Sequence, residues 1–198
     1  MKKLLFFSLS ILFFAITSCE KDNSTSIEGR VLEEGTNKPL PNKMVYIYRT
    51  ESVFLGSYSE YSVDTIFSDS NGNYKWMTPD KGTDVLSIKA IDPLYFTKIT
   101  QTINSGKNKG KNLFLQPKAW IRYHVKNIKP FDDNDRIKTG FLDSPLYGQN
   151  INDSFMVQGG GNQKNFVYWF VTKNSKKIEY RDSIFVKGLD TLNYNINY

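Results

Sequence analysis

The stretch LNYNINY, residues 192–198, shows the fold class most plainly. A large apolar or aromatic side chain occupies every second position, and asparagine occupies the positions between them. Because successive side chains of a β-strand point to opposite faces, this spacing predicts a strand with one packed face and one face in water. No stretch after residue 19 sustains the 3.6-residue apolar period of an amphipathic helix. The sequence therefore predicts an all-β protein.

The same alternation recurs through the C-terminal half of the chain. Aromatic residues make up 15% of the sequence and fall largely inside such runs, which suits half-buried strands. We expect strands at residues 120–127, 166–172, 178–180 and 183–186. The run at 166–172 is apolar on both faces, which predicts a central strand covered on both sides. Six to eight such strands predict an immunoglobulin-like or fibronectin-like sandwich over residues 117–198.

A first sandwich is expected over residues 26–116. Its strands are expected at residues 27–32, 44–49, 64–68, 74–76, 85–90, 99–103 and 112–115. The run from Asp69 to Asn73 predicts a turn, in which Gly72 supplies the positive φ that other residues resist. Residues 51–63 are longer and richer in Ser and Tyr than a tight hairpin needs, so we expect an insertion there.

The motifs of this N-terminal half resemble those of a known family. In order, they are Gly29-Arg30-Val31, Pro39-Leu40, Val45-Tyr46-Ile47 and the D-x-x-G-x-Y run from Asp69 to Tyr74. Their order and spacing resemble the carboxypeptidase regulatory-like β-sandwich, which is related in shape to transthyretin-like and CNA-B-like modules. The resemblance implies a packing or adhesion unit without the zinc and catalytic groups of the peptidase.

Pro117 marks the expected boundary between the two sandwiches. Proline has no backbone N–H to donate to a neighbouring strand, so the segment Gln116-Pro117-Lys118 is the best candidate for a short linker. We therefore expect one domain at 26–116 and a second at 117–198.

The first eighteen residues have the organisation of an export signal. Lys2 and Lys3 precede an apolar core, and the residues become small before Cys19. The core is too short for a transmembrane helix, which needs about 20 apolar residues. The tetrad Ile16-Thr17-Ser18-Cys19 resembles the bacterial lipobox, which implies cleavage after residue 18 and a lipid-modified Cys19. An ordinary secreted protein cleaved nearby is the alternative.

Residues 19–25 are expected to form a lipidated start and a polar tether. Glu20, Lys21 and Asp22 resemble the export signal that carries Bacteroidota-type lipoproteins to the outer face of the outer membrane. The pairing of both halves also resembles surface lipoproteins of that group. We therefore expect a protein anchored to the outer membrane through its lipid and exposed at the cell surface.

Composition excludes several classes of function. Loss of Lys2 and Lys3 lowers the net charge from +6 to +4, and acidic residues are interleaved with basic ones, which is not the pattern of a nucleic-acid-binding protein. Cys19 is the only cysteine, so its lipidation leaves no disulfide, thiolate metal site or cysteine nucleophile. We expect no cofactor and no metal.

Few residues are candidates for chemistry. His124 is the only histidine, and without a nearby carboxylate in sequence we expect a structural role rather than a general base. The acidic loop around Asp132 is a conceivable cation site, although a solvated loop is the simpler interpretation. The turn at Asp69 lacks the glycine position of a calcium loop, and residues 159–161 lack the lysine and hydroxyl of a phosphate-binding loop.

The remaining candidates concern binding and modification. Tyr58 and Tyr61 lie in the expected insertion and are candidate ligand contacts, for a protein or a glycan partner. Thr65, Ser183 and Thr191 follow aspartate and precede an aliphatic residue, which resembles the O-glycosylation pattern of the same bacterial group. We expect a non-enzymatic binding, adhesion or assembly module, with a carbohydrate-binding accessory of glycan uptake as the alternative.

Replacement of Cys19 by alanine tests the anchor. The variant should be left uncleaved or be released, and it should not incorporate labelled palmitate, because the acyl acceptor is the thiol of this residue. Labelling that persists in Cys19→Ala would contradict the lipoprotein interpretation.

Overall fold

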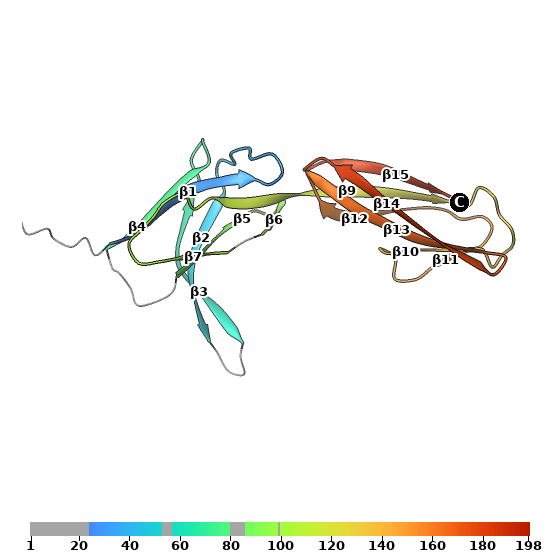
Figure 1. The fold of residues 1–198 in the computed structure, drawn as a ribbon, viewed down its shortest axis with the longest axis horizontal. Coiled ribbons are helices and arrows are strands. Elements are labelled where there is room, and N and C mark those ends of the chain that lie inside the picture. Colours follow the sequence, from blue (N-terminus) through green and yellow to red (C-terminus); the bar gives the residue numbers. More distant parts are fainter. Residues whose placement is uncertain (1–23, 53–56, 80–85, 99) are drawn as a thin grey trace, which may run out of the picture.

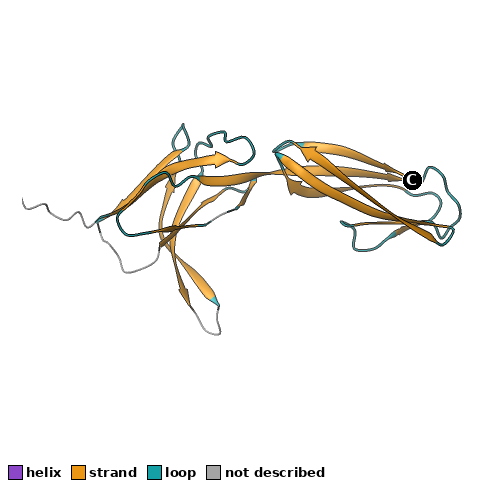
Figure 2. Ribbon diagram, in the orientation of Figure 1, coloured by secondary structure: helices purple, strands orange, loops and turns teal. Residues whose placement is uncertain are grey.

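The computed structural model describes residues 24–52, 57–79, 86–98 and 100–198. The described part of the chain consists of strands and loops (Figure 2), which confirms the all-β prediction. The strands are β1 (Thr25–Glu33), β2 (Met44–Ser52), β3 (Tyr58–Phe67), β4 (Asn73–Thr78), β5 (Leu86–Ile91), β6 (Tyr95–Thr97), β7 (Gln101–Ile103), β8 (Lys107–Asn108), β9 (Leu113–Lys126), β10 (Arg136–Thr139), β11 (Leu146–Tyr147), β12 (Asn152–Gly160), β13 (Gln163–Lys173), β14 (Lys176–Val186) and β15 (Thr191–Asn197). No helix within these residues is long and apolar enough to cross a membrane.

The N-terminal lobe is a sandwich of two sheets. One sheet has the order β9-β1-β4, with β6 beside β9 and β8 beside β1, and the other has the order β3-β2-β5-β7. Alternate side chains of these strands point between the sheets, and Ile27, Val45, Ile47 and Ile88 are fully buried there. The core of this lobe is formed by residues between Ile27 and Leu115.

The C-terminal lobe is a second sandwich. Its first sheet joins β12 and β15 to the two sides of β9, and its second sheet has the order β11-β10-β13-β14. Tyr123 and Val125 of β9 pack in one core with Ile137, Val167 and other residues up to Ile196. The alternation of residues 192–198 is confirmed, because Ile196 is buried while the asparagines on either side of it are exposed.

β9 belongs to both lobes. Its start pairs with β1 and β6, and residues 118–126 pair with β12 (Figure 1). The sequence predicted two strands, at 112–115 and 120–127, with a linker at Pro117 between them. Instead the strand continues through Pro117, which is buried, and its carbonyl accepts a hydrogen bond from the Gly161 N–H at 2.7 Å. The missing N–H of one proline does not end the strand, because neighbouring residues keep their ladder bonds.

Polar contacts join the two lobes beside this strand. The Asn162 side chain donates to the Glu33 carboxylate at 3.1 Å and to the Glu34 carbonyl at 3.2 Å. Asn162 has a left-handed φ of 55°, and it lies in the tight connection between β12 and β13. Residues 159–161 form the end of β12 and the start of the connection between β12 and β13.

Two glycine requirements explain the N-terminal motif. The turn after Asp69 is confirmed, and Gly72 has a φ of 76°. A Cβ on Gly29 would lie 2.1 Å from the Lys111 carbonyl oxygen, so only glycine lets that segment approach β1. These contacts account for two positions of the G-x-V and D-x-x-G-x-Y patterns.

Two parts of the chain have more strand than the sequence predicts. In the expected insertion at 51–63, β2 extends to Ser52 and β3 begins at Tyr58, while residues 53–56 lie outside the described residues. The two arms form a long antiparallel hairpin that extends away from the N-terminal sandwich (Figure 1). The strands expected at 178–180 and 183–186 are one strand, β14.

Separate expression of the lobes tests the predicted boundary at Pro117. Each lobe has its own buried cluster, so residues 24–116 and residues 117–198 should each unfold cooperatively in a thermal melt. The joined chain is the control. If both fragments stay unfolded while the joined chain folds, the lobes form one cooperative unit and the boundary is wrong.

Candidate functional site

A column of aromatic side chains lies on the outer face of β13. Phe166, Tyr168 and Phe170 alternate with Val167 and Val171, which are buried in the core. Phe166 is 80% exposed and Tyr168 is 44% exposed. The expectation that this strand is covered on both faces is therefore wrong. β13 is central in its sheet, but no described residues form a layer over its outer face.

The exposed apolar area continues onto the neighbouring strand. Phe166 pairs with Ser183 of β14, and Phe185 of the same strand is 60% exposed. Ser183 and Phe185 point to the same face as the aromatic column, because directly paired residues of antiparallel strands share a face. Contiguous exposed apolar area of this kind is uncommon on soluble proteins and commonly marks a binding surface.

The column forms one wall of a shallow hollow of about 510 Å³. Its other wall comes from β14, where Glu179 and Arg181 contribute polar groups beside the rings. Asp182 of the same strand pairs with the buried Val167, so its side chain points to the inner face of the sheet. The hydrogen bond from the Tyr194 hydroxyl lowers the pKa of Asp182, and the N–H of Ser183 adds to this effect. Asp182 therefore stays ionised at neutral pH on the inner face of the sheet. Glu179 and Arg181 are the charged groups that lie beside the aromatic rings in the hollow.

Neighbouring residues pack closely around the Tyr168 ring. A Cβ on Gly140 would lie 2.3 Å from the Tyr168 ring, so the absence of a side chain at Gly140 creates the space that the ring occupies. The centroids of Tyr168 and Phe170 are 6.3 Å apart and their planes are inclined by 77°. Phe141 packs at 6.5 Å from Tyr168 and stacks on the buried Tyr123 at 5.1 Å. These ring contacts connect the exposed column to the core.

A second hollow, of about 290 Å³, adjoins the Phe170 end of the column. It is lined by Arg136 and Lys138 of β10 and by Lys177 of β14, with Phe170 as a shared wall. The Lys177 ammonium lies 4.0 Å from the centroid of the Phe170 ring, a cation–π distance. We call the aromatic column together with both hollows the aromatic platform.

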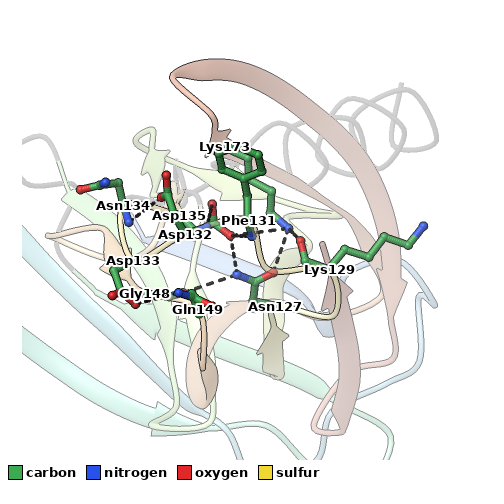
Figure 3. A network of polar contacts seen from close by, with 10 residues as sticks. All are labelled: Asn127, Lys129, Phe131, Asp132, Asp133, Asn134, Asp135, Gly148, Gln149 and Lys173. Carbon is green, nitrogen blue, oxygen red and sulfur yellow. Dashed lines mark hydrogen bonds and ion pairs between the residues drawn. The ribbon is translucent and has the colours of Figure 1, made fainter.

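The acidic loop after β9 forms a hydrogen-bonded network rather than an open site (Figure 3). The Asp135 carboxylate is fully shielded from water and accepts from the Phe131 N–H at 2.7 Å and from the Asn127 amide at 2.9 Å. The Lys173 ammonium donates to the Asn127 side-chain oxygen at 2.8 Å and to the Lys129 carbonyl at 2.5 Å. This network fastens the loop to the ends of β9 and β13.

The charge state of Asp135 follows from the same contacts. Burial raises the pKa of its carboxyl, but the hydrogen bonds from Phe131, Asn127 and Asp132 and the nearby Lys173 ammonium outweigh it, and the pKa lies below its ordinary value. Asp135 is therefore ionised, and its carboxylate accepts the hydrogen bonds that hold the loop in place. Among the described residues, no group of three or more His, Cys, Asp or Glu side chains could hold a metal ion.

His124 lies on the outer side of β9. Its Nδ1 is 2.7 Å from the Ser154 hydroxyl of the neighbouring strand β12. Among the described residues, no carboxylate is hydrogen-bonded to the imidazole. A serine and a histidine without an orienting acid lack the third member of a catalytic triad.

The candidate ligand contacts Tyr58 and Tyr61 lie on strand β3 rather than in a loop. They are 70% and 44% exposed. The Arg49 guanidinium lies 5.8 Å from the Tyr61 ring centroid, which partly covers that ring. Both tyrosines are accessible, but they lie in the N-terminal lobe, whereas the aromatic platform lies in the C-terminal lobe.

The three candidate glycosylation residues all lie at exposed strand positions. Thr65 is on β3, Ser183 on β14 and Thr191 on β15. Ser183 is directly opposite Phe166, so a sugar attached there would lie against the aromatic column. Cys19, Glu20, Lys21 and Asp22 lie outside the described residues.

The residues of the aromatic platform were not identified as a site from the sequence. A signal for them exists in β14, where the positions facing the aromatic column are Lys177, Glu179, Arg181 and Ser183. Four polar side chains at alternate positions indicate a solvent-facing side. The residues of β13 that pair with these positions must point to the same side, so Phe166, Tyr168 and Phe170 could have been assigned to the surface.

Comparison with known proteins gives distant structural likenesses only. No family model and no curated protein matches the chain. The C-terminal domain of the shaft pilin SpaA from Lactobacillus rhamnosus GG is 10% identical with a TM-score of 0.36, over 48% of this chain and 98% of that domain. The Bacillus anthracis TIE protein is 12% identical with a TM-score of 0.37, over 88% of this chain and 34% of that protein. A DUF3823 family protein from Bacteroides uniformis ATCC 8492 is 13% identical with a TM-score of 0.31, over 82% and 99%.

Replacement of Asp135 by alanine tests the role of the network in stability. The change leaves the Phe131 N–H and the Asn127 amide without their acceptor, so the free energy of unfolding should fall by about 2 kcal/mol. Asp133→Ala, at an exposed position of the same loop, is the control and should change it by less than about 0.5 kcal/mol.

The effect of Asp135→Ala should depend on pH. The folded pKa of Asp135 lies below its ordinary value of 3.8, so its contribution is complete above about pH 5 and is lost as the pH falls through the folded pKa. Urea titrations from pH 7 to pH 3 should show a constant difference from the wild type at first, and a shrinking one below about pH 4. An equal difference at every pH would show that the charge of Asp135 is not involved.

Proposed function

We propose that the protein is a non-enzymatic lipoprotein of the outer membrane, exposed at the cell surface, that acts as a binding, adhesion or assembly module. The observation that carries this proposal is the aromatic platform, with Phe166 and Tyr168 exposed on a rigid sheet face. Lipidation of Cys19 would supply the anchor, and the export signal at Glu20, Lys21 and Asp22 would supply the outer-face location.

The described side chains support binding rather than catalysis. His124 contacts Ser154 on a sheet surface, and the buried Asp135 is fully engaged in fastening its loop. Asp182 is ionised and accepts from the Tyr194 hydroxyl, so it is poorly suited to donate a proton as a general acid. The platform offers rings and charges for contact, without a nucleophile and base in mutual reach.

Carbohydrate binding is the second candidate function, as an accessory of a surface glycan-uptake system. The observation that favours it is that the platform places charged side chains beside a row of aromatic rings. The apolar C–H face of a sugar ring packs well against an aromatic ring. Phe166, Tyr168 and Phe170 offer a ring at every second residue of the strand, and the centroids of Tyr168 and Phe170 are 6.3 Å apart. Glu179 and Arg181 lie beside them and can hydrogen-bond to sugar hydroxyls.

The double variant Phe166→Ser/Tyr168→Ser tests the platform. Binding of labelled residues 24–198 to a glycan array and to whole bacterial cells should fall at least tenfold, because the contact area is removed. The melting temperature should change little through Phe166, which is 80% exposed, and it should fall modestly through Tyr168, which packs against Phe141.

Tyr58→Ser/Tyr61→Ser is the matched control, because it removes two exposed aromatic rings from the other lobe. If this variant loses binding and the platform variant does not, the contact surface is the β2–β3 hairpin. Turnover of a glycan or peptide by the purified protein, abolished by His124→Ala, would contradict the non-enzymatic proposal.

A further inference from the structure

The basic end of the aromatic platform indicates the class of ligand, an inference that rests on the proposed function. Arg136 of β10, Thr172 of β13 and Lys177 of β14 form one row across the three strands. Lys138, Phe170 and Glu179 form the next row. Side chains of directly paired residues share a face, so both rows point to the side of the aromatic column.

This end of the platform has an excess of positive charge. Glu179, the only acidic residue in the two rows, is paired with the Arg181 guanidinium at 2.5 Å. Within the described residues, Arg136, Lys138 and Lys177 form no ion pair with a carboxylate. Lys138 is held instead by the carbonyls of Leu142 and Asp143. Three cations therefore surround the 290 Å³ hollow without internal neutralisation.

We propose that the platform binds an anionic polysaccharide. Its sugar rings pack along Phe166, Tyr168 and Phe170, and its carboxylate or sulfate groups enter the basic hollow. Arg136 is planar and suited to bidentate contact with such groups, and Lys177 is already held over the Phe170 ring. The alignment of the aromatic column with the hollow lets one extended chain reach both.

The distribution of charge on the platform favours a polysaccharide over a nucleic acid. Glu179 and Arg181 are the outward charged side chains that line the larger hollow, and they pair with each other at 2.5 Å, so they add no net positive charge there. A nucleic acid carries a phosphate at every residue, and only the basic end of the platform would neutralise it. A polysaccharide instead presents hydroxyl groups along the larger hollow, which can hydrogen-bond to Glu179 and Arg181. A sugar chain with acidic groups at the basic end thus matches the charges of the platform.

Calorimetric titration of residues 24–198 tests the inference. Polygalacturonate and chondroitin sulfate are the anionic probes, and dextran and laminarin are the neutral ones. The anionic probes should bind at least tenfold more tightly, and their affinity should fall as sodium chloride is raised, because salt screens exposed charges.

The double variant Arg136→Gln/Lys177→Gln should lose at least tenfold in affinity for the anionic probes and keep its affinity for any neutral glycan. Lys38→Gln/Lys75→Gln is the matched control. Both of its lysines are exposed, they lie in the other lobe, and the change in net charge is the same. This control should bind the anionic probes like the wild type.

The possible outcomes separate this inference from the proposed function. The inference of an anionic ligand would be overturned if the anionic probes bind no better than the neutral ones. It would also be overturned if Arg136→Gln/Lys177→Gln and Lys38→Gln/Lys75→Gln lose the same affinity. In either case the platform would remain a binding surface. Equal competition by single-stranded DNA would also overturn the inference, in favour of a general polyanion surface. If no probe binds and Phe166→Ser/Tyr168→Ser has no effect on cell binding, the proposed function itself fails.

Discussion

The continuous hydrogen bonding of β9 is the constraint on which the rest of the structure depends. Every backbone N–H and C=O of this long, largely buried strand needs a partner, and β1 and β6 satisfy its start while β12 and β15 satisfy its end. One strand is therefore part of a sheet in each lobe. Pro117 is accommodated at the crossing point because its carbonyl still has a partner, the Gly161 N–H. The lobes meet through backbone and a few polar contacts, so their two cores stay separate.

The exposed aromatic platform follows from this arrangement. β9 brings only β12 and β15 to its sheet in the C-terminal lobe, so that sheet covers one face of β10, β13 and β14. The other face has no described layer above it, and the outward residues of β13 face solvent. Phe166 contributes little to the stability of the folded state, because its ring is 80% exposed and buries little apolar area. A binding role explains a feature that folding alone does not require.

The platform and the Asp135 network show how function and stability are divided in this lobe. Asp135 has no exposure and satisfies three donors, so its loss affects folding. In the platform, Tyr168 packs against Phe141 at the edge of the core, whereas Phe166 is 80% exposed and can change with little effect on the core. Lys173 connects the ends of β9 and β13 through Asn127.

The alternation in residues 192–198, 44–49 and 166–172 by itself determined that the protein is all-β and where many strands lie, because a two-residue period is a local property of the chain. Gly72 was placed correctly for the same reason, since its positive φ belongs to one turn. Only the tertiary structure decided which strands join. It continued β9 through Pro117, paired β2 with β3 beyond the sandwich, buried Asp135 and left Phe166 and Tyr168 uncovered. Burial depends on which layers pack together. Packing between residues far apart in sequence cannot be predicted from the alternation within any one strand.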